Sequence, residues 1–409
     1  MMSPLSRWLS AVLFFVPLCA LASEESIPLT DSIAAALADA GTQVATHVPA
    51  TGACEVFDAF CTLTQRQKIY SYNEEVAYTL AHGAAIGGVR SVAVLKSHGF
   101  AKAANSIVDS LIAGNTAGFV VLVFDDKTGR HSDTVLDTKA LVEGTKILHV
   151  QPSPETAYAE IQQAFLTSEQ FRTPVAVLFD SDDLTRPVPV RHNILPPPSA
   201  TYQRDVYQFL LCPPLAAYQH RAWQSRISGL PPPGDKPPLP TIPDLPPKYQ
   251  AATSTYAPLF DAFKKIKHNE SVVTGDTGTS TFFALPPYDC VDISTYYGGS
   301  LPLAVGLSLA GHKNTWAIAG DFAFIAATHM GLPEALQRQR PIKFILFHNG
   351  IASATGGQPI QPDVFENMLA GYQPYVKTLR YDASPDDIEN TLRTIQNSDR
   401  LEILVVEIP

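Results

Sequence analysis

The stretch Thr315-Trp316-Ala317-Ile318-Ala319-Gly320-Asp321 is an apolar run that ends in a glycine and a carboxylate, immediately before a helical pattern. A second apolar run at 343–347 is followed by Asn349-Gly350. Runs of this kind are typical of parallel strands covered on both faces. Where such a strand opens onto a helix, free N–H groups and the helix dipole favour a phosphate. Asp321, Asn349 and a backbone carbonyl near Ile351 provide the oxygen ligands that Mg²⁺ prefers, so we predict a cation bridging a diphosphate at this sheet edge.

The same alternation of strands and helices extends over both halves of the chain. Strands are predicted at 91–95, 119–124, 175–179, 271–274, 315–319, 343–347 and 401–406. Helices are predicted at 73–88, 101–113, 154–167, 256–267, 323–338 and 385–397. This order indicates an α/β fold with two doubly wound parallel-sheet domains, at 23–195 and 251–409.

The segment at 196–250 separates the two domains and has a different composition. It contains 14 of the 34 prolines of the chain. Because proline lacks the N–H donor that helices and sheets require, we expect an extended Pro-rich crossover with at most a short helix near 202–211.

The first 22 residues have the pattern of a signal peptide. Arg7 precedes an apolar run at 11–22, which ends in Ala20-Leu21-Ala22 before Ser23. The run is shorter than the roughly 20 residues that a membrane span needs, and no later segment reaches that length. We therefore expect cleavage near Ser23 and a periplasmic or secreted protein without a membrane span; the alternative is an uncleaved N-terminal membrane anchor.

Charge and cysteine content exclude several classes of function. The net charge of -10 is spread along the chain, and no segment combines basic clusters with aromatic residues, so nucleic acid is not an expected partner. No Cys-x-x-Cys pair is present, which removes the usual ligand spacing of iron–sulfur clusters and structural zinc.

Gly320-Asp321 followed by Asn349 resembles the signature of thiamine-diphosphate-dependent enzymes, in which an Asn follows a Gly-Asp by just under thirty residues. The resemblance implies that 23–195 is a pyrimidine-binding domain and 251–409 a diphosphate-binding domain. It also implies Mg²⁺ held by Asp321, Asn349 and Ile351. In that family the cofactor lies between two chains, so a homodimer or homotetramer is expected.

Three further segments resemble the family in the right order. Tyr297 precedes Gly298 and a Leu-Pro-x-Ala-x-Gly helix, at the position where a large, usually aliphatic, residue supports the cofactor. The loop at 274–279 resembles the family's diphosphate loop. Glu74 opens a helix with Gly83 nine residues later, as does the family's glutamate that contacts the pyrimidine ring and promotes loss of a cofactor proton. Glu75 is the control for this assignment; in the alternative interpretation, Glu74 and Glu75 are both solvated acids that complement the helix dipole. The implied cofactor-binding residues are Glu74, Thr277, Gly278, Thr279, Tyr297, Gly298, Gly320, Asp321, Phe322, Ala323, Asn349 and Ile351.

Within that family, the chain resembles the catalytic α-subunit of indolepyruvate ferredoxin oxidoreductase in Asp125-Asp126 with His131-Ser132, and in the loop at 354–359. The last four residues of that loop, Gly356-Gly357-Gln358-Pro359, also resemble phosphonopyruvate decarboxylase. His131 matches a histidine of the first family, and His47 and His98 follow other predicted strands. His98 and His131 are the preferred substrate residues, because imidazole can transfer a proton or orient a carboxylate.

The chain lacks the Cys-rich ferredoxin module of that subunit. We therefore expect decarboxylation of a small-molecule 2-oxo acid to an aldehyde or acyloin. Oxidative decarboxylation with an external electron acceptor, or a non-catalytic thiamine-diphosphate-binding protein, are the alternatives.

Overall fold

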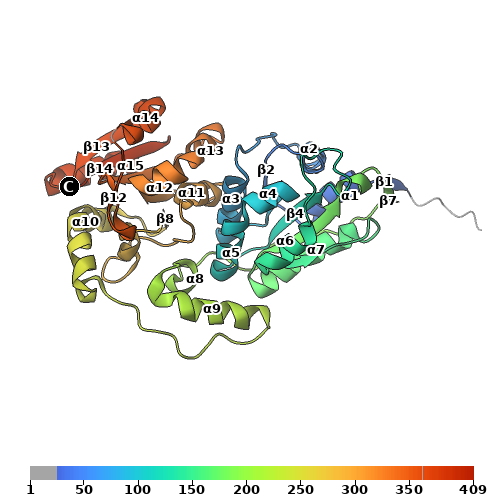
Figure 1. Cartoon of the computed structure of the whole chain (residues 1–409), viewed down its shortest axis with the longest axis horizontal. Helices are drawn as coiled ribbons and strands as arrows, with labels where there is room; N and C mark the ends of the chain where they lie inside the picture. Colours follow the sequence, from blue (N-terminus) through green and yellow to red (C-terminus); the bar gives the residue numbers. More distant parts are fainter. Residues whose placement is uncertain (1–24, 362) are drawn as a thin grey trace, which may run out of the picture.

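The computed structural model describes residues 25–361 and 363–409, so the predicted signal peptide lies outside the described residues. The N-terminal half is built on a five-stranded, fully parallel sheet (Figure 1). Its strands, in spatial order, are β2 (Val44–His47), β3 (Ser91–Lys96), β4 (Phe119–Asp125), β6 (Val175–Asp180) and β5 (Leu148–Val150). Helices lie between consecutive strands, as parallel connections require.

The C-terminal half contains a second five-stranded parallel sheet. Its strands, in spatial order, are β8 (Val273–Gly275), β9 (Trp316–Gly320), β10 (Lys343–His348), β14 (Glu402–Glu407) and β13 (Val376–Arg380). Numbered within each half, both sheets have the order 1-2-3-5-4. The two halves therefore share one topology, although no direct sequence repeat connects them.

Both faces of each sheet are covered by helices, because alternate strand residues belong to different apolar clusters. In the N-terminal half, α1 (Leu29–Asp39), α2 (Ala53–Leu63) and α7 (Ala157–Phe171) pack on one face. The opposite face carries α3 (Glu74–Ile86), α5 (Ala104–Ala113) and α6 (Thr138–Thr145). In the C-terminal half, α10 (Pro247–Ile266) and α15 (Pro385–Gln396) cover one face. Helices α11 (Ser300–Leu309), α13 (Gly331–Gln337) and α14 (Val364–Leu369) cover the other. The predicted α/β class with two doubly wound sheets is confirmed.

The two halves meet where α3 packs against α11, in the centre of Figure 1. The contact depends on two glycines. A Cβ atom at Gly83 would lie 2.5 Å from the carbonyl oxygen of Leu303, and one at Gly306 would lie 2.0 Å from that of Leu80. Such distances are too short for any side chain, so the glycines allow the two helix backbones to touch.

The crossover contains more helix than we predicted. Beside the short α8 (Val206–Phe209), a 15-residue helix, α9 (Pro213–Ile227), lies below both halves in Figure 1. The prolines at its start occupy the first turn, where no N–H partner is lost, and residues 215–227 contain neither proline nor glycine. The high proline content of the whole segment therefore concealed a helix of ordinary composition.

Two predicted helices are broken in the structure. The predicted helix at 101–113 is divided at Ala103 into α4 (Ser97–Lys102) and α5. The one at 323–338 is divided into α12 (Asp321–Ala326), a 3₁₀ turn η4 (Thr328–Met330) and α13. At the second break, Pro333 prevents a continuous helix because its ring would clash with the carbonyl of His329. The hydroxyl of Thr328 donates to the buried Asp276 at 2.6 Å in the same turn. Within the described residues, no helix has the length and apolarity needed to cross a membrane.

Candidate active site

A cavity of about 380 Å³ lies at the carboxyl end of the C-terminal sheet. Its walls come from the loop after β8, the start of α12, and the segment after β10. It is lined by Tyr256, Thr277, Gly278, Thr279, Ser280, Tyr297, Gly320, Asp321, Phe322, Ala323, Phe347, Asn349, Ile351, Ala352, Ser353, Ala354 and Thr355. Every predicted cofactor residue except Glu74 and Gly298 is among them. These predicted residues come from four separate segments of the chain. The segments that follow parallel strands meet at this edge of the sheet, as the topology requires.

Asp321 occupies the centre of this cavity wall. One carboxylate oxygen accepts the backbone N–H groups of Asn349 at 2.9 Å and Gly350 at 2.7 Å, and the other accepts its neighbour Phe322 N–H at 2.7 Å. Burial raises the pKa of Asp321, although these three N–H groups oppose that shift. The bonds join the end of β9 to the end of β10, so the two predicted cation ligands lie side by side.

Two glycines leave part of the cavity wall uncovered by side chains. Gly278 has φ +154°, and a Cβ atom added to it, or to Gly320, would meet no other atom within 4 Å. The backbone is therefore accessible to a group placed in the cavity. Thr277, Thr279 and Ser280 bring hydroxyl groups to the same wall. This combination suits the oxygens of a phosphate, which accept bonds from backbone N–H and hydroxyl donors.

The buried side chain of Asp276 lies outside the cavity lining and bonds to segments that surround the cavity. Its buried carboxylate accepts bonds from the N–H groups of Gly298 at 2.5 Å and Gly299 at 3.1 Å, and from the hydroxyl groups of Ser300 and Thr328. Burial raises the pKa of Asp276 to about 6, against the effect of these donors. Gly298 therefore lies behind the cavity wall, bonded to Asp276. Sequence reasoning had placed this carboxylate only within a phosphate loop.

Aromatic side chains form the apolar wall. Tyr297 and Phe322 remain 42% and 44% exposed at the mouth, whereas Tyr256 and Phe347 are buried and lie 4.4 Å apart between ring centroids. Tyr256 comes from α10, a helix whose sequence contains no signal for a site. It was missed, as were Phe347 and Ser280. The lining residues Ala354 and Thr355 begin the loop at 354–359 that sequence resemblance had marked.

The predicted catalytic residues of the N-terminal half form a second group, outside this cavity. Glu74 is the first residue of α3, and Asn73 caps that helix by accepting the N–H groups of Glu75 and Val76. The Glu74 carboxylate lies 3.2 Å from the ammonium of Lys102 and packs over Gly99, where a Cβ atom would lie 2.7 Å from Glu74 Cγ. Glu74 is therefore fixed in position at the carboxyl end of the N-terminal sheet.

His98 lies beside Glu74 on the neighbouring helix α4. Its Nε2 contacts the Thr134 hydroxyl at 2.9 Å, and its buried Nδ1 has no hydrogen-bond partner within the described part of the chain. His131 is exposed, and its backbone N–H donates to Asp126 at 2.8 Å. The hydroxyl of Ser132 and this N–H lower the pKa of Asp126 to about 2. Of the two histidines, only His98 has an enclosed ring nitrogen that lacks a hydrogen-bond partner among the described residues.

His47 and Glu75 are both held by hydrogen bonds within the N-terminal half. His47 is fully buried, with its ring nitrogens 2.9 Å from the Val94 carbonyl and 3.1 Å from Cys54 Sγ. Burial lowers its pKa, which favours a neutral, structural imidazole. Glu75 is not a free solvent-facing acid, because it accepts a 2.8 Å bond from the Ser106 hydroxyl. Its charge also contributes, after burial, to raising the pKa of Asp109 to about 6.

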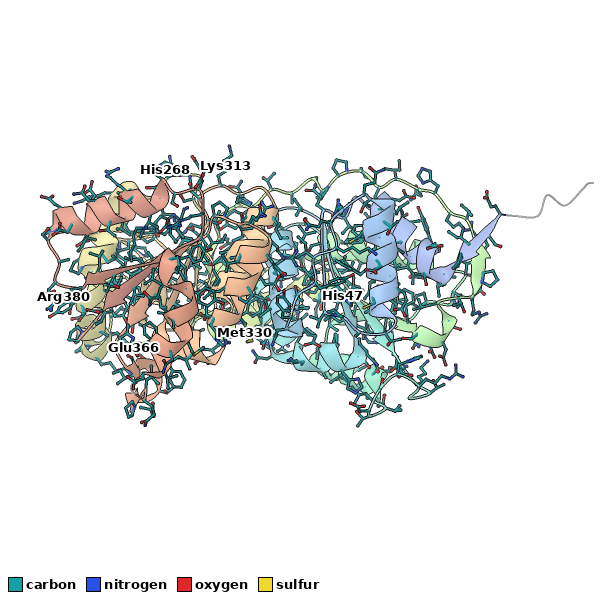
Figure 2. The ribbon with its side chains drawn as sticks, turned by 90° about the horizontal axis from the view of Figure 1, so that it is seen from above. His47, His268, Lys313, Met330, Glu366 and Arg380 are labelled. Carbon is teal, nitrogen blue, oxygen red and sulfur yellow. The ribbon has the colours of Figure 1, made fainter. Side chains whose placement is uncertain are left out.

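The segment before Glu74 is held by the C-terminal half. The amide of Gln337 donates to the carbonyl of Tyr70 at 3.0 Å, and the side-chain amide of Asn73 lies 3.3 Å from the sulfur of Met330. Figure 2 shows Met330 where the two halves meet, whereas His47 lies within the N-terminal half. The two groups of candidate residues therefore belong to one connected structure.

The chain is similar to a known protein family and to several known proteins. Residues 276–397 match the C-terminal TPP binding domain of thiamine pyrophosphate enzymes. The indolepyruvate oxidoreductase subunit IorA of Methanothermobacter thermautotrophicus is 27% identical over 198 residues, which cover 47% of this chain and 32% of the relative. The corresponding subunit of Thermococcus kodakarensis is 30% identical over 145 residues, or 34% of this chain and 22% of the relative. The matched regions thus span about a third of these relatives or less.

The fold itself is shared with solved structures. The thiamine diphosphate-dependent 4-hydroxybenzoylformate decarboxylase of Rhodococcus jostii superimposes with a TM-score of 0.64, covering 93% of this chain and 99% of the decarboxylase at 14% identity. At that identity the likeness establishes architecture alone. Together with the match over 276–397, it shows that this chain has the two-domain fold of thiamine-diphosphate-dependent enzymes and resembles those that act on 2-oxo acids.

Proposed function

We propose that this protein binds thiamine diphosphate and Mg²⁺ and decarboxylates a 2-oxo acid to an aldehyde or an acyloin. The observation that supports this most is the single cavity that combines open glycine backbone, threonine hydroxyls and the Asp321–Asn349 pair. These features match a diphosphate and its cation. The apolar wall opposite them suits an uncharged ring system.

The donor set fits Mg²⁺ better than a softer metal. Asp321 and Asn349 provide oxygen atoms, and Ile351 contributes its backbone carbonyl in this proposal. Within the described residues, no group of three or more His, Cys, Asp or Glu side chains could hold a metal ion. The remaining ligands would therefore be phosphate oxygens and water, as Mg²⁺ commonly requires.

The cofactor supplies a nucleophilic carbon that adds to the carbonyl of the 2-oxo acid and accepts the electron pair left by CO₂. In our proposal, Glu74 holds a proton on a nitrogen of the pyrimidine ring, which promotes formation of that nucleophile. His98 carries a proton to the product or orients the substrate carboxylate, and His131 is the second candidate for this role. The free, enclosed Nδ1 of His98 favours it.

The separation of Glu74 from the cavity supports a homodimer or homotetramer. The residues that line the cavity all lie between 256 and 355, so none comes from the N-terminal half. A second copy could bring its Glu74 to the open side, where Tyr297, Phe322 and Ile351 are at least 36% exposed. The cofactor would then lie between two chains.

Oxidative decarboxylation is the second candidate function. It is favoured by the names of the relatives, which are oxidoreductase subunits. It would require an external electron acceptor. A non-catalytic binder of thiamine diphosphate is the third, and the aromatic residues Tyr297 and Phe322 at the cavity mouth favour it. The N-terminal pattern further supports our proposal that the protein acts in the periplasm or is secreted, with an uncleaved anchor as the alternative.

Product analysis distinguishes these functions. The protein is incubated with thiamine diphosphate, Mg²⁺ and aryl, branched and acidic 2-oxo acids, with and without an artificial one-electron acceptor. Aldehyde or acyloin without acceptor supports the main proposal, and turnover only with acceptor supports oxidation. Cofactor binding with no turnover in either condition indicates a binder.

A matched pair of variants tests the role of Glu74. In Glu74→Gln, we expect cofactor affinity to remain and turnover to fall by about 10²- to 10⁴-fold, the usual contribution of a general acid–base group. Exchange of the cofactor C2 proton, followed by NMR, should slow by a similar factor. Glu143→Gln is the control, because Glu143 is an exposed acid of the same half. Equal exchange rates in the two variants would remove Glu74 from this role.

A further inference from the structure

A second cavity, of about 560 Å³, lies far from the candidate active site in sequence and in lining residues. It is formed by the carboxyl-terminal ends of α5 and α7 together with α8, α9 and the proline-rich segment after α9. Its polar lining includes Arg172, Arg226, Lys236, Gln208 and Asp205. The crossover and the N-terminal half thus enclose a cavity with three basic side chains.

The two arginines of this cavity have no carboxylate partner among the described residues. The guanidinium of Arg226 donates from one terminal nitrogen to the carbonyls of Leu111 at 2.6 Å and Ile112 at 3.2 Å, while its buried Nε has no partner there. Burial, together with the neighbouring charge of Arg172, lowers the pKa of Arg226 to about 10. The Nε of Arg172 donates to the carbonyl of Asn115 at 3.5 Å. Among the described residues, the two neighbouring positive charges therefore have carbonyl oxygens, and no carboxylate, as their partners.

The other polar groups do not provide that compensation. The only carboxylate in the lining belongs to Asp205, and it accepts the N–H of Tyr207 at the start of α8. The Lys236 ammonium lies 3.8 Å above the Tyr207 ring, a contact that leaves its positive charge in place. The buried amide nitrogen of Gln208 has no acceptor in the described part of the chain. The lining residues therefore carry three positively charged side chains and one carboxylate.

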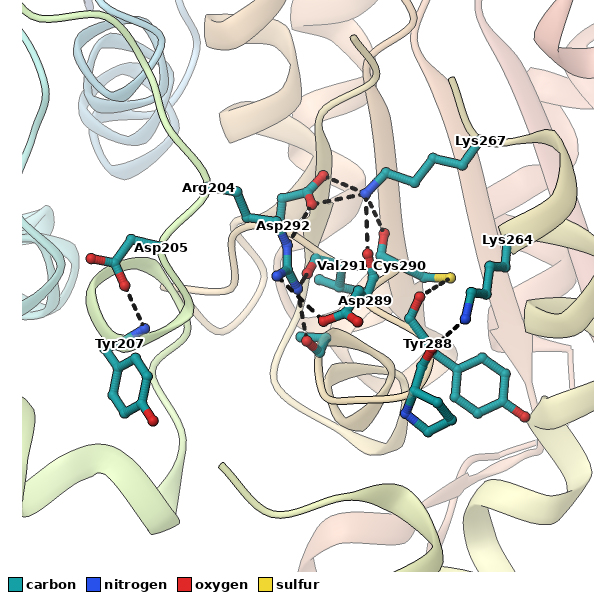
Figure 3. A network of polar contacts seen from close by, with 12 residues as sticks. Arg204, Asp205, Tyr207, Lys264, Lys267, Tyr288, Asp289, Cys290, Val291 and Asp292 are labelled. Carbon is teal, nitrogen blue, oxygen red and sulfur yellow. Dashed lines mark hydrogen bonds and ion pairs between the residues drawn. The ribbon is translucent and has the colours of Figure 1, made fainter. Parts of the chain in front are cut away.

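Arg204, elsewhere in the crossover, is paired with an acid, as Figure 3 shows. It donates to the buried Asp292 at 3.0 Å, and the ammonium of Lys267, at the end of α10, contacts both oxygens of the same carboxylate at 2.8 and 2.9 Å. The arrangement around Arg172 and Arg226 is different.

Helix ends account for part of this arrangement. The carbonyls at the carboxyl-terminal ends of α5 and α7 favour nearby cations. That effect explains the bonds from Arg226 to Leu111 and Ile112. It accounts for one arginine at each helix end, and it leaves the ammonium of Lys236 in the same lining unexplained.

We infer that this cavity is a second ligand site, which binds a small polyvalent oxyanion bearing phosphate or carboxylate groups. Planar guanidinium groups match the oxygens of phosphate and carboxylate, and the ammonium of Lys236 adds a third positive charge to the same lining. The site is separate from the proposed active site and does not depend on the proposed reaction.

Calorimetric titration of the full chain tests this inference. Inorganic phosphate and malonate serve as separate probes for the two kinds of oxyanion, at constant ionic strength set with chloride. We expect saturable binding of at least one probe. Arg172→Gln and Lys236→Gln should each weaken it by about tenfold or more, because charge-assisted hydrogen bonds are among the strong ones.

Two further variants protect the test from loss of folding. Arg221→Gln is the matched control, since Arg221 lies on α9 but is exposed and paired with Asp235 at 2.6 Å. It should bind as the unmodified protein does. Arg226→Lys keeps a cation at the end of α5 while removing the planar fork, so it should remain folded and bind more weakly. Absence of saturable binding of both probes, or equal weakening by Arg172→Gln and Arg221→Gln, would overturn the inference.

Discussion

Replacing Arg338 by methionine tests how the C-terminal half supports the segment before Glu74. The Arg338 Nε donates to Glu334 at 2.9 Å, and the two side chains are 7% and 1% exposed. A terminal nitrogen of Arg338 also reaches the carbonyl of Ile69 at 3.4 Å and the hydroxyl of Ser71 at 3.3 Å. The pair thus connects α13 to the segment that leads into α3.

The expected cost follows from the burial of Glu334. Removing one partner of a buried ion pair leaves an uncompensated charge, which destabilises a protein by about 3–5 kcal/mol. Only the amide of Gln337, at 3.0 Å, would still contact the Glu334 carboxylate. We therefore expect the free energy of unfolding, measured with urea, to fall by about that amount in Arg338→Met. Turnover of the 2-oxo acid should also fall, because the segment before Glu74 loses two of its contacts.

Two variants make the reasoning refutable. Arg393→Met removes a similar i,i+4 ion pair, with Glu389, whose side chains are 53% and 32% exposed. It should cost no more than about 1 kcal/mol, because solvent screens an exposed pair. The double variant Glu334→Leu/Arg338→Met should recover most of the lost stability, since no buried charge remains. If the double variant were as unstable as Arg338→Met, desolvation of Glu334 would not be the cause.

Three further predictions concern the cation, the domain contact and the N-terminus. Burial raises the pKa of Asp321, and a cation needs the ionised carboxylate. Mg²⁺-dependent cofactor affinity, measured by calorimetry across pH, should therefore fall as the pH is lowered, beginning above the usual range of an aspartate. Asp321→Ala should abolish the Mg²⁺ dependence. Gly306→Ala should lower the free energy of unfolding by about 1–3 kcal/mol or more, because its Cβ would lie 2.0 Å from the Leu80 carbonyl. In Gly144→Ala, the control, the added Cβ meets no atom within 4 Å. This variant should be neutral or stabilising by up to about 1 kcal/mol in thermal unfolding. N-terminal sequencing of the exported protein should begin at or near Ser23, and intact Met1 on cytoplasmic material would contradict the signal-peptide prediction.

The strands were predictable because each is a short apolar run between helices and is covered on both faces. The predicted strand at 343–347 corresponds to β10 and the one at 119–124 to β4, each within one residue. The edge strand β13, by contrast, was missed because it has no such run: Lys377, Thr378 and Arg380 alternate with apolar residues, and the strand is only partly buried. Periodicity is therefore informative mainly where both faces of a strand are buried.

Helix breaks were less well predicted. The break at 327–330 had a sequence signal that we missed, because Pro333 cannot donate to, and clashes with, the carbonyl of His329 in a continuous helix. The bond from Thr328 to Asp276 at the same place could not be read from the sequence. The helix α9 was hidden for the opposite reason, since its neighbours on both sides are rich in proline. The prediction for this segment was therefore dominated by the composition on either side of α9 and not by that of α9.

The sequence by itself determined the class of the fold and the cavity at Gly320-Asp321 and Asn349. Strand ends in a parallel sheet meet at one edge, so residues that follow consecutive strands must converge. Only the tertiary structure decided that the cavity receives no residue from the N-terminal half, that Tyr256 lines it, and that Asp276 supports it from behind. It also revealed Arg172 and Arg226 in one cavity, without a carboxylate partner among the described residues. Such relations depend on which helices pack together, and helix packing is set by contacts between residues far apart in the chain.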